Sequence, residues 1–264
     1  MRYFTQPSIG TPLNPAHTLN SGLVGYWPMG EGAGSVTRDM SGKGNHGTLI
    51  NMVQGSTSGW TGGKFGSGIL FDGVNDVVQI PHNASLNLTN RFAISLWFKP
   101  SVLTQTNRYL LSKVLSAAIN DNAYSVIWEY VNNTVEFYSG SFTGTNPRLN
   151  TQIVVTKADW SHVMYVYDGF LLRSWLNGVV VNASSPTFNL VPTTGNLFIG
   201  NLNLTSLAQP AAAAIAEVRI YNRALTVEES QRLYHDPFCM YEQENKFRWL
   251  TTFDRKGSFF FSRL

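Results

Sequence analysis

Glu129 and Glu136 are the two carboxylates whose placement decides whether this chain could cleave a glycosidic bond. A retaining glycosidase holds two carboxyl groups about 5 Å apart, one as the nucleophile and one as the acid. Asn132 and Asn133 lie between these two glutamates, which are otherwise isolated, and no Glu-x-Asp spacing occurs anywhere in the chain. We therefore predict that the protein is not an enzyme.

Other residue types that carry catalysis or bind zinc show no suitable spacing. Cys239 is the single cysteine and lies close to the C-terminus. His46, His82, His162 and His235 lack the short separations of a zinc site. We interpret His162, which lies in a strand-like run, as a packed or surface imidazole.

Exposed aromatic side chains could bind carbohydrate by stacking on sugar rings, while Asn, Asp and Gln hydrogen bond to the hydroxyls. The candidates for this role are Trp128, Tyr130 and Tyr138. Tryptophan also buries a large apolar area in protein cores. We therefore interpret Trp97 and Trp175 as core residues, and we leave Trp128 open between core and sugar platform.

The elements that would position these residues are short strands. Alternating apolar and polar runs extend from Leu23 to Tyr221 and are separated by Gly, Asn-Gly, Asp-Gly and Pro turns. Asp168-Gly169 and Asn177-Gly178 have the composition of hairpin turns. This pattern predicts an all-β protein, in which two antiparallel sheets pack as a jelly-roll-like sandwich.

A strand and a short helix end the alternating region. Val218 and Ile220 alternate with polar neighbours, as in a half-buried strand. Thr226 then stands at the N-cap position of a helix, and Glu229 completes a capping box. We predict one short helix over residues 226–234.

Seven motifs occur in order between residues 22 and 235. They are Gly22–Trp27, Asp39–Leu49 (D-x-S-G-x-G-N-x-G-T-L), Gly68–Val78 (containing F-D-G), Phe92–Lys99 (F-x-I-S-x-W-F-K), Trp160–Gly169 with Trp175–Val181, Asn196–Asn201, and Ala216–Tyr234 (containing E-V-R-I-Y-N-R-A-L). This series resembles the laminin G-like domains of the concanavalin A-like lectin/glucanase superfamily. The resemblance implies a concanavalin A-like sandwich, whose members are recognition or structural modules more often than enzymes.

The resemblance also implies a calcium site. Calcium takes six to eight oxygen ligands, and the family often binds it between the early loop and the closing strand. The matching residues here are Asp39, Asn45 and Glu217, but Ala216 stands where the family usually has an aspartate. We expect that no cofactor is required and that calcium, if bound at these three residues, is held weakly.

Charge and hydropathy exclude two classes of partner. The formal net charge is +3 and the sequence pI is about 9.0, yet no basic run exists that would contact nucleic acid. No run of 18 apolar residues exists, so we predict no membrane insertion. The first residues lack the apolar stretch of a secretory signal, and we expect synthesis in a cytoplasm.

The two ends of the chain differ in composition from the region between them. Residues 1–21 carry three prolines and no periodicity, which predicts an extended N-terminal arm. Residues 22–235 form the predicted laminin G-like sandwich. Residues 236–264, the C-terminal tail, hold more aromatic side chains than a solvated tail does, so we predict that the tail attaches the protein to other subunits. The predicted assembly contacts are Phe238, Tyr241, Phe247, Trp249, Phe259, Phe260 and Phe261.

We interpret the protein as a non-catalytic structural and recognition protein. The short helix followed by an aromatic and basic tail resembles, more loosely, laminin G-like proteins encoded by tailed phages. That resemblance implies a subunit of the virion surface, in capsid decoration or the tail, made in the host cytoplasm. Its partners would be further copies or other virion proteins, and a cell-surface glycan. The alternative is a free bacterial carbohydrate-binding module or adhesin, extracellular or on the cell surface.

Overall fold

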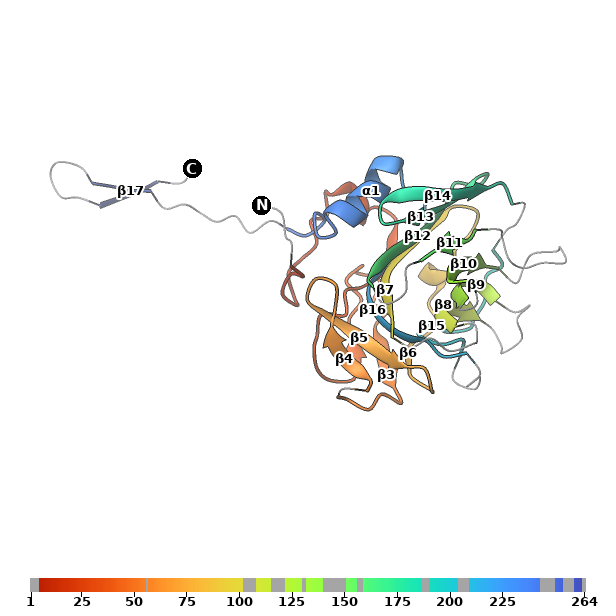
Figure 1. Cartoon of the computed structure of the whole chain (residues 1–264). Coiled ribbons are helices and arrows are strands. Elements are labelled where there is room, and N and C mark those ends of the chain that lie inside the picture. The colour runs from red at the N-terminus through yellow and green to blue at the C-terminus, as the bar shows by residue number, and fades with distance from the viewer. Residues whose placement is uncertain are drawn as a thin grey trace.

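The computed structural model describes residues 5–55, 57–101, 108–114, 122–129, 132–139, 151–155, 159–186, 190–203, 209–242, 250–253 and 259–262. Of residues 122, 250–253 and 259–262 it describes the backbone alone. Two antiparallel sheets of eight strands each pack face to face (Figure 1). The predicted all-β sandwich is therefore confirmed.

The first sheet contains, in spatial order, β14 (Val179–Ser184), β13 (Leu172–Leu176), β12 (Ser161–Tyr167), β7 (Phe92–Pro100), β16 (Ala212–Tyr221), β5 (Ser67–Asp72) and β4 (Gly59–Gly62), with β1 (Leu23–Trp27) also paired to β16. The second sheet contains β11 (Ile153–Val154), β10 (Thr134–Tyr138), β9 (Asn122–Glu129), β8 (Arg108–Val114), β15 (Leu197–Ile199), β6 (Val77–Ile80), β3 (Gly47–Ile50) and β2 (Val36–Thr37). Two short 3-10 helices, η1 (Thr18–Asn20) and η2 (Ala84–Leu86), and one α-helix, α1 (Val227–His235), complete the domain. The strands β17 (Leu250–Phe253) and β18 (Phe259–Ser262) pair in a separate two-stranded sheet.

The main core lies between the two sheets. Alternation along β9 points Tyr124, Val126 and Trp128 inward, and alternation along β12 does the same for Val163 and Tyr165. All five side chains are buried in one cluster. Trp128 is only 1% exposed, so the structure answers the question that the sequence left open: this tryptophan is core and cannot stack on a sugar.

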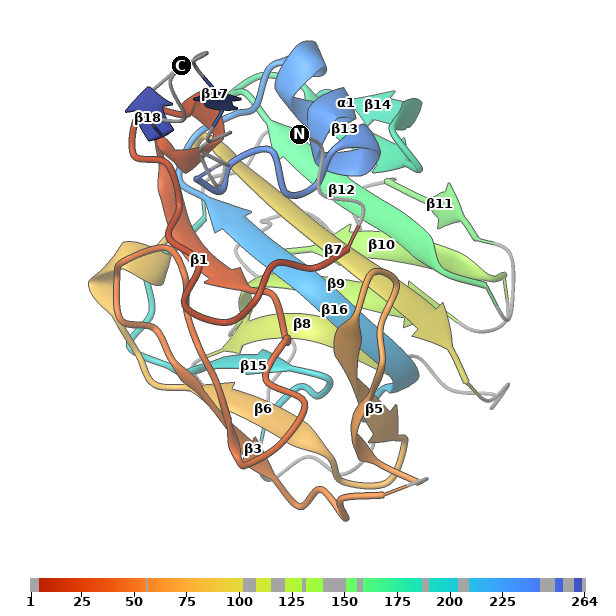
Figure 2. The same cartoon turned by 90° about the vertical axis from the view of Figure 1, so that its left-hand side faces the viewer.

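A second hydrophobic cluster covers the outer face of the first sheet. Trp175 and Met164 point outward from this sheet and meet Leu19 of η1, Leu233 of α1 and Phe238 of the C-terminal tail. Figure 2 looks onto this face, with α1 lying across it. The central strands of the first sheet are therefore buried on both faces, and this explains why every residue of β12 and β16 is buried.

The chain ends pair with each other on that same outer face. Asn14 N donates to Met240 O at 2.9 Å, and Glu242 N donates to Pro12 O at 2.9 Å. Phe238 and Tyr241 are 0% and 3% exposed. The prediction that these two aromatics contact other subunits is therefore wrong, because they complete the fold of their own chain.

The other predicted assembly residues stay untested. Phe247 and Trp249 lie outside the described residues. Phe259, Phe260 and Phe261 belong to β18, whose backbone alone is described.

The predicted helix is α1, shifted by one residue. Thr226 Oγ1 accepts from Glu229 N at 3.2 Å, and Glu229 Oε2 accepts from Thr226 N at 3.0 Å, which is the predicted capping box. Among the described residues, no helix has the length and apolar character needed to span a membrane.

Replacing Phe238 tests whether the tail belongs to the core. We expect Phe238→Ala to lower the free energy of unfolding by about 3–5 kcal/mol, because it leaves a cavity in the outer cluster. Urea denaturation measures this loss. The matched control is Phe170→Ala, since Phe170 is 75% exposed and should cost far less. Equal midpoints for the two variants would show that Phe238 is not a core residue.

Candidate functional site

A cluster of polar side chains lies on the outer face of the second sheet, at the end formed by β9 and β10. It consists of Glu129, Asn132, Thr134, Glu136 and Gln152, and we refer to it as the polar cluster. Asn132 and Gln152 are exposed, whereas Glu129, Thr134 and Glu136 are buried beneath them. Thr134 Oγ1 lies 3.4 Å from Glu129 Oε2 and 3.4 Å from Glu136 Oε1. Asn132 Nδ2 donates to Glu129 Oε2, and Gln152 Nε2 donates to Glu136 Oε1, both at 3.0 Å.

The β9–β10 hairpin brings the two glutamates together. Asn132 and Asn133 form its turn, with Asn133 at a φ of 53°. Thr134 then pairs with Glu129 in register, and Glu136 follows two residues later on the same face. The interpretation of Glu129 and Glu136 as isolated from each other by the two asparagines is therefore wrong. The Asn-Asn pair between two alternating runs was the sequence signal for a turn.

Aromatic and aliphatic side chains continue the outer face beyond the polar cluster. Tyr138 follows Glu136 on the same face of β10 and is half-buried against a cluster that includes Tyr109, Ile127 and Phe198. Of the three predicted sugar-stacking residues, Tyr138 is thus the one placed on this surface. Tyr130 lies outside the described residues.

A β-bulge in β16 places a charged residue on the opposite side of the molecule. Ile215 and Val218 both face the core although they are three residues apart, so the strand contains one extra residue between them. Glu217 takes up the irregularity with a φ of 56°. Because of the bulge, its carboxylate lies on the outer face of the first sheet.

Glu217 lies at the centre of a buried network. Its Oε2 accepts from Tyr26 Oη at 2.8 Å and from Arg219 Nη2 at 2.7 Å, and its Oε1 accepts from Gln6 Nε2 at 3.0 Å. Arg219 Nη2 also donates to the carbonyl of Pro237 at 2.8 Å. Burial raises the pKa of the Glu217 carboxyl, and the Arg219 charge opposes that rise. The network therefore joins β1, β16 and both chain ends.

The predicted calcium ligands do not converge. Asp39 accepts the backbone N–H of Tyr26 at 3.0 Å, whereas Glu217 accepts the phenol of the same tyrosine, so the two carboxylates lie at opposite ends of Tyr26. Asp39 is also occupied by the backbone N–H groups of Ser41 and Asn45, at 2.8 and 2.9 Å. Across the described ranges, no three His, Cys, Asp or Glu residues are grouped so that they could hold a metal ion. The side chains present do not fit a calcium site.

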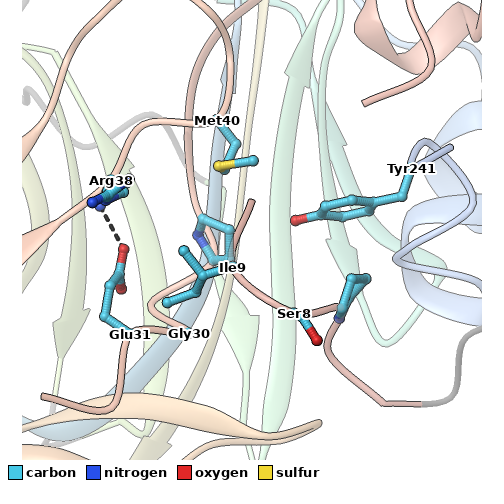
Figure 3. Close-up of a pocket in the computed structure, with 9 residues that line it drawn as sticks. Ser8, Ile9, Gly30, Glu31, Arg38, Met40 and Tyr241 are labelled. Carbon is cyan, nitrogen blue, oxygen red and sulfur yellow. Dashed lines mark hydrogen bonds between the residues drawn. The ribbon is translucent and has the colours of Figure 1, made fainter. Parts of the chain in front are cut away.

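A small cavity lies beside this network, between the N-terminal arm and Tyr241. Figure 3 shows Tyr241 directed toward Ser8 and Ile9 of the arm, with Glu31, Arg38 and Met40 on the far side. The cavity measures about 20 Å³. That volume is enough for one water molecule and far too small for a sugar ring.

His162 forms a buried pair with a serine. Its Nε2 lies 2.8 Å from Ser95 Oγ, and the ring lies near that of Trp97, with 5.1 Å between centroids and a tilt of 36°. Burial lowers the pKa of His162 to about 3. A base that is fully buried and this weak cannot activate Ser95 for attack on a substrate, so we interpret the pair as structural. Of the two alternatives that the sequence left open, a packed or a surface imidazole, the structure shows the packed one.

Comparisons with known proteins agree with this architecture. Residues 72–230 match the family described as the concanavalin A-like lectin/glucanases superfamily. A search among curated proteins gave no match.

Several solved structures share the fold at low identity. Domain 4 of AbnA, an extracellular arabinanase of Geobacillus stearothermophilus, was solved with arabinotriose; it superposes with a TM-score of 0.62 at 20% identity, over 81% of this chain and 98% of that one. A Trypanosoma rangeli sialidase bound to sialic acid gives 0.61 at 18% identity, over 89% and 37% of the two chains. The binding domain of Paraclostridial Mosquitocidal Protein 1 gives 0.60 at 15% identity, over 84% and 54%. This chain thus spans nearly all of the arabinanase domain but only part of the other two.

Calcium should have little effect on stability. We expect about 1 mM calcium, compared with a chelator, to leave the Tm unchanged within error, because Asp39 and Glu217 already accept hydrogen bonds from the protein. Differential scanning calorimetry measures this. A rise of more than about 10 °C would show strong linked binding and would contradict the geometry described here.

The buried His162 predicts a pH dependence of stability. The unfolded chain takes up a proton on this residue near its ordinary pKa of 6.5, whereas the folded chain does so only near 3. Stability is therefore complete above pH 6.5 and is lost as the pH falls toward 3, by up to about 1.4 kcal/mol per pH unit.

The variant His162→Asn lacks this titration. Unfolding free energies of the two proteins, measured from pH 7 to pH 4, should converge as the pH falls. Parallel curves would show that His162 is not held neutral in the folded protein.

Proposed function

The chain belongs to the concanavalin A-like lectin/glucanases superfamily, and we propose that it is a non-catalytic carbohydrate-binding module. The binding surface in this proposal is the outer face of the second sheet, at the polar cluster and Tyr138. The observation that carries it is the convergence of Glu129, Thr134, Glu136 and Gln152 beside an aromatic ring. The exposed amides of Asn132 and Gln152 can both donate to and accept from sugar hydroxyls, the carboxylates behind them fix their orientation, and the ring offers an apolar surface.

The surroundings of the two glutamates favour binding over cleavage. Asn132 and Gln152 each donate an amide hydrogen bond to a carboxylate. The carboxylates therefore act as fixed acceptors that hold the two amides in place. Exposed amides held in this way suit recognition of hydroxyls.

The comparisons support this function better than a place on a virus particle. The arabinanase domain, of which this chain covers 98%, was solved with a bound trisaccharide. None of the similar structures described above is a virion protein, and the burial of Phe238 and Tyr241 removes two contacts on which the virion hypothesis depended. We propose accordingly that the ligand is an oligosaccharide encountered outside the cell or at a cell surface.

Binding to a glycan panel tests the proposal. The panel contains arabinotriose, other neutral oligosaccharides and sialylated glycans, and titration calorimetry measures affinity for each ligand retained. We expect Tyr138→Ala and Gln152→Ala each to weaken binding by at least about tenfold, or 1.4 kcal/mol, through loss of the apolar surface or of an exposed amide.

Phe170→Ala is the matched control for Tyr138→Ala, because Phe170 is an exposed aromatic on the β12–β13 turn of the other sheet. It should leave affinity unchanged. If no glycan binds the folded protein, the function is wrong. If binding survives both site variants, the assigned surface is wrong.

A further inference from the structure

Gln6 of the N-terminal arm fills a slot on the outer face of the first sheet. Its amide nitrogen donates to Pro28 O at 2.7 Å and to Glu217 Oε1 at 3.0 Å, and its amide oxygen accepts from Ser67 N at 2.9 Å. Its backbone N–H donates to Phe65 O at 3.0 Å. A primary amide has two N–H donors and one carbonyl acceptor. The slot, which we refer to as the glutamine slot, therefore offers a partner to each polar group of this side chain.

Two glycines form the walls of the glutamine slot. A Cβ atom at Gly66 would lie 2.8 Å from Gln6 Oε1, and one at Gly30 would lie 3.1 Å from Gln6 Cδ. Neither glycine has the positive φ that would by itself favour glycine. The close approach of the amide is therefore the reason why these two positions lack a side chain, and the slot matches glutamine in shape as well as in hydrogen bonding.

The arm depends on Gln6 for its docking at this point. Most of residues 7–11 are exposed, and within the described part of the chain none of them forms a hydrogen bond with the sandwich. When Gln6 leaves, Glu217 keeps the phenol of Tyr26 and the guanidinium of Arg219 as donors. Release of the arm therefore leaves no buried charge unpaired, which is the usual cost of breaking such a network. Docking of this part of the arm is reversible at low cost.

We propose that the glutamine slot is a peptide-binding site specific for a glutamine side chain, which the protein's own arm occupies and which another peptide can fill when the arm is released. Glutamate would place a carboxylate against two acceptors, Pro28 O and the carboxylate of Glu217, and is rejected. Proline is accepted after the glutamine, because Pro7 has no N–H that needs a partner. The polar cluster belongs to the other sheet, so this site is independent of whether sugar binds there.

Hydrogen exchange of the Ser67 amide, followed by NMR on the full chain, reports whether the slot is filled, because this N–H donates to Gln6 Oε1. We expect Gln6→Glu and Gly66→Ala each to speed this exchange by at least about tenfold. The first change introduces charge repulsion, and the second narrows the slot. The matched controls are Gln231→Glu, at an exposed position of α1, and Gly62→Ala, where an added methyl group meets nothing within 4 Å. Both controls should exchange like the unmodified chain.

A synthetic peptide with the sequence of residues 5–12 tests binding from solution. It is added to the Gln6→Glu protein at roughly 1–5 mM, a range suited to a short segment with few contacts. The peptide should restore slow exchange of the Ser67 amide, whereas the same peptide with glutamate in place of glutamine should not. The unmodified chain should take up neither peptide, because its own arm competes at a high effective concentration.

Two results would overturn the proposal. One is exchange of the Ser67 amide that stays slow in both Gln6→Glu and Gly66→Ala. The other is a Gln6→Glu protein that ignores the glutamine peptide or binds the two peptides equally. Thermal unfolding checks that each variant is folded. If Gln6→Glu does not fold, Gln6→Ala takes its place in the titration, because it empties the slot without adding a charge.

Discussion

The removal of the central strands of the first sheet from water on both faces is the constraint on which the rest of the structure depends. Its inner face meets the second sheet, while the outer face is covered by η1, α1 and the segment around Phe238. This cover includes an ion pair, and burying two charges costs several kcal/mol unless their hydrogen bonds are satisfied. Glu217 receives donors from the N-terminal arm, from β1 and from β16, so the sheet and the chain ends stabilise each other.

The bulge in β16 makes that arrangement possible. Without the extra residue, alternation from Ile215 would turn the side chain of Glu217 into the core between the sheets. A non-glycine residue at positive φ costs about 1 kcal/mol or more, and four hydrogen bonds through Glu217 and Arg219 offset that cost. The bulge therefore lets one strand serve two environments. Its inner face packs in the apolar core, and its outer face carries the hydrogen-bonded ion pair of Glu217 and Arg219.

Local patterns predicted much of the fold but not the contacts between distant segments. The sandwich, the capping box at Thr226 and the inward face of β12 follow from side-chain period and turn chemistry, which neighbouring residues fix. The proximity of Glu129 and Glu136 depends on hairpin register, and the position of Glu217 depends on a one-residue insertion; alternation alone reveals neither. The prediction that Phe238 contacts another subunit was wrong for a related reason. Aromatic composition indicates that a segment will be buried, but not whether its own chain or another one buries it.

The polar cluster and the chain ends lie on opposite layers of the sandwich. The segments at both ends of the domain, which spans Thr5 to Glu242, run over the outer face of the first sheet. Glu129 and Glu136 belong to the second sheet. Anything joined to the domain through either end is consequently attached behind it. The two sheets, with roughly 10 Å between their mid-planes, separate that attachment from the polar cluster. The polar cluster therefore faces away from anything that is joined to the chain ends.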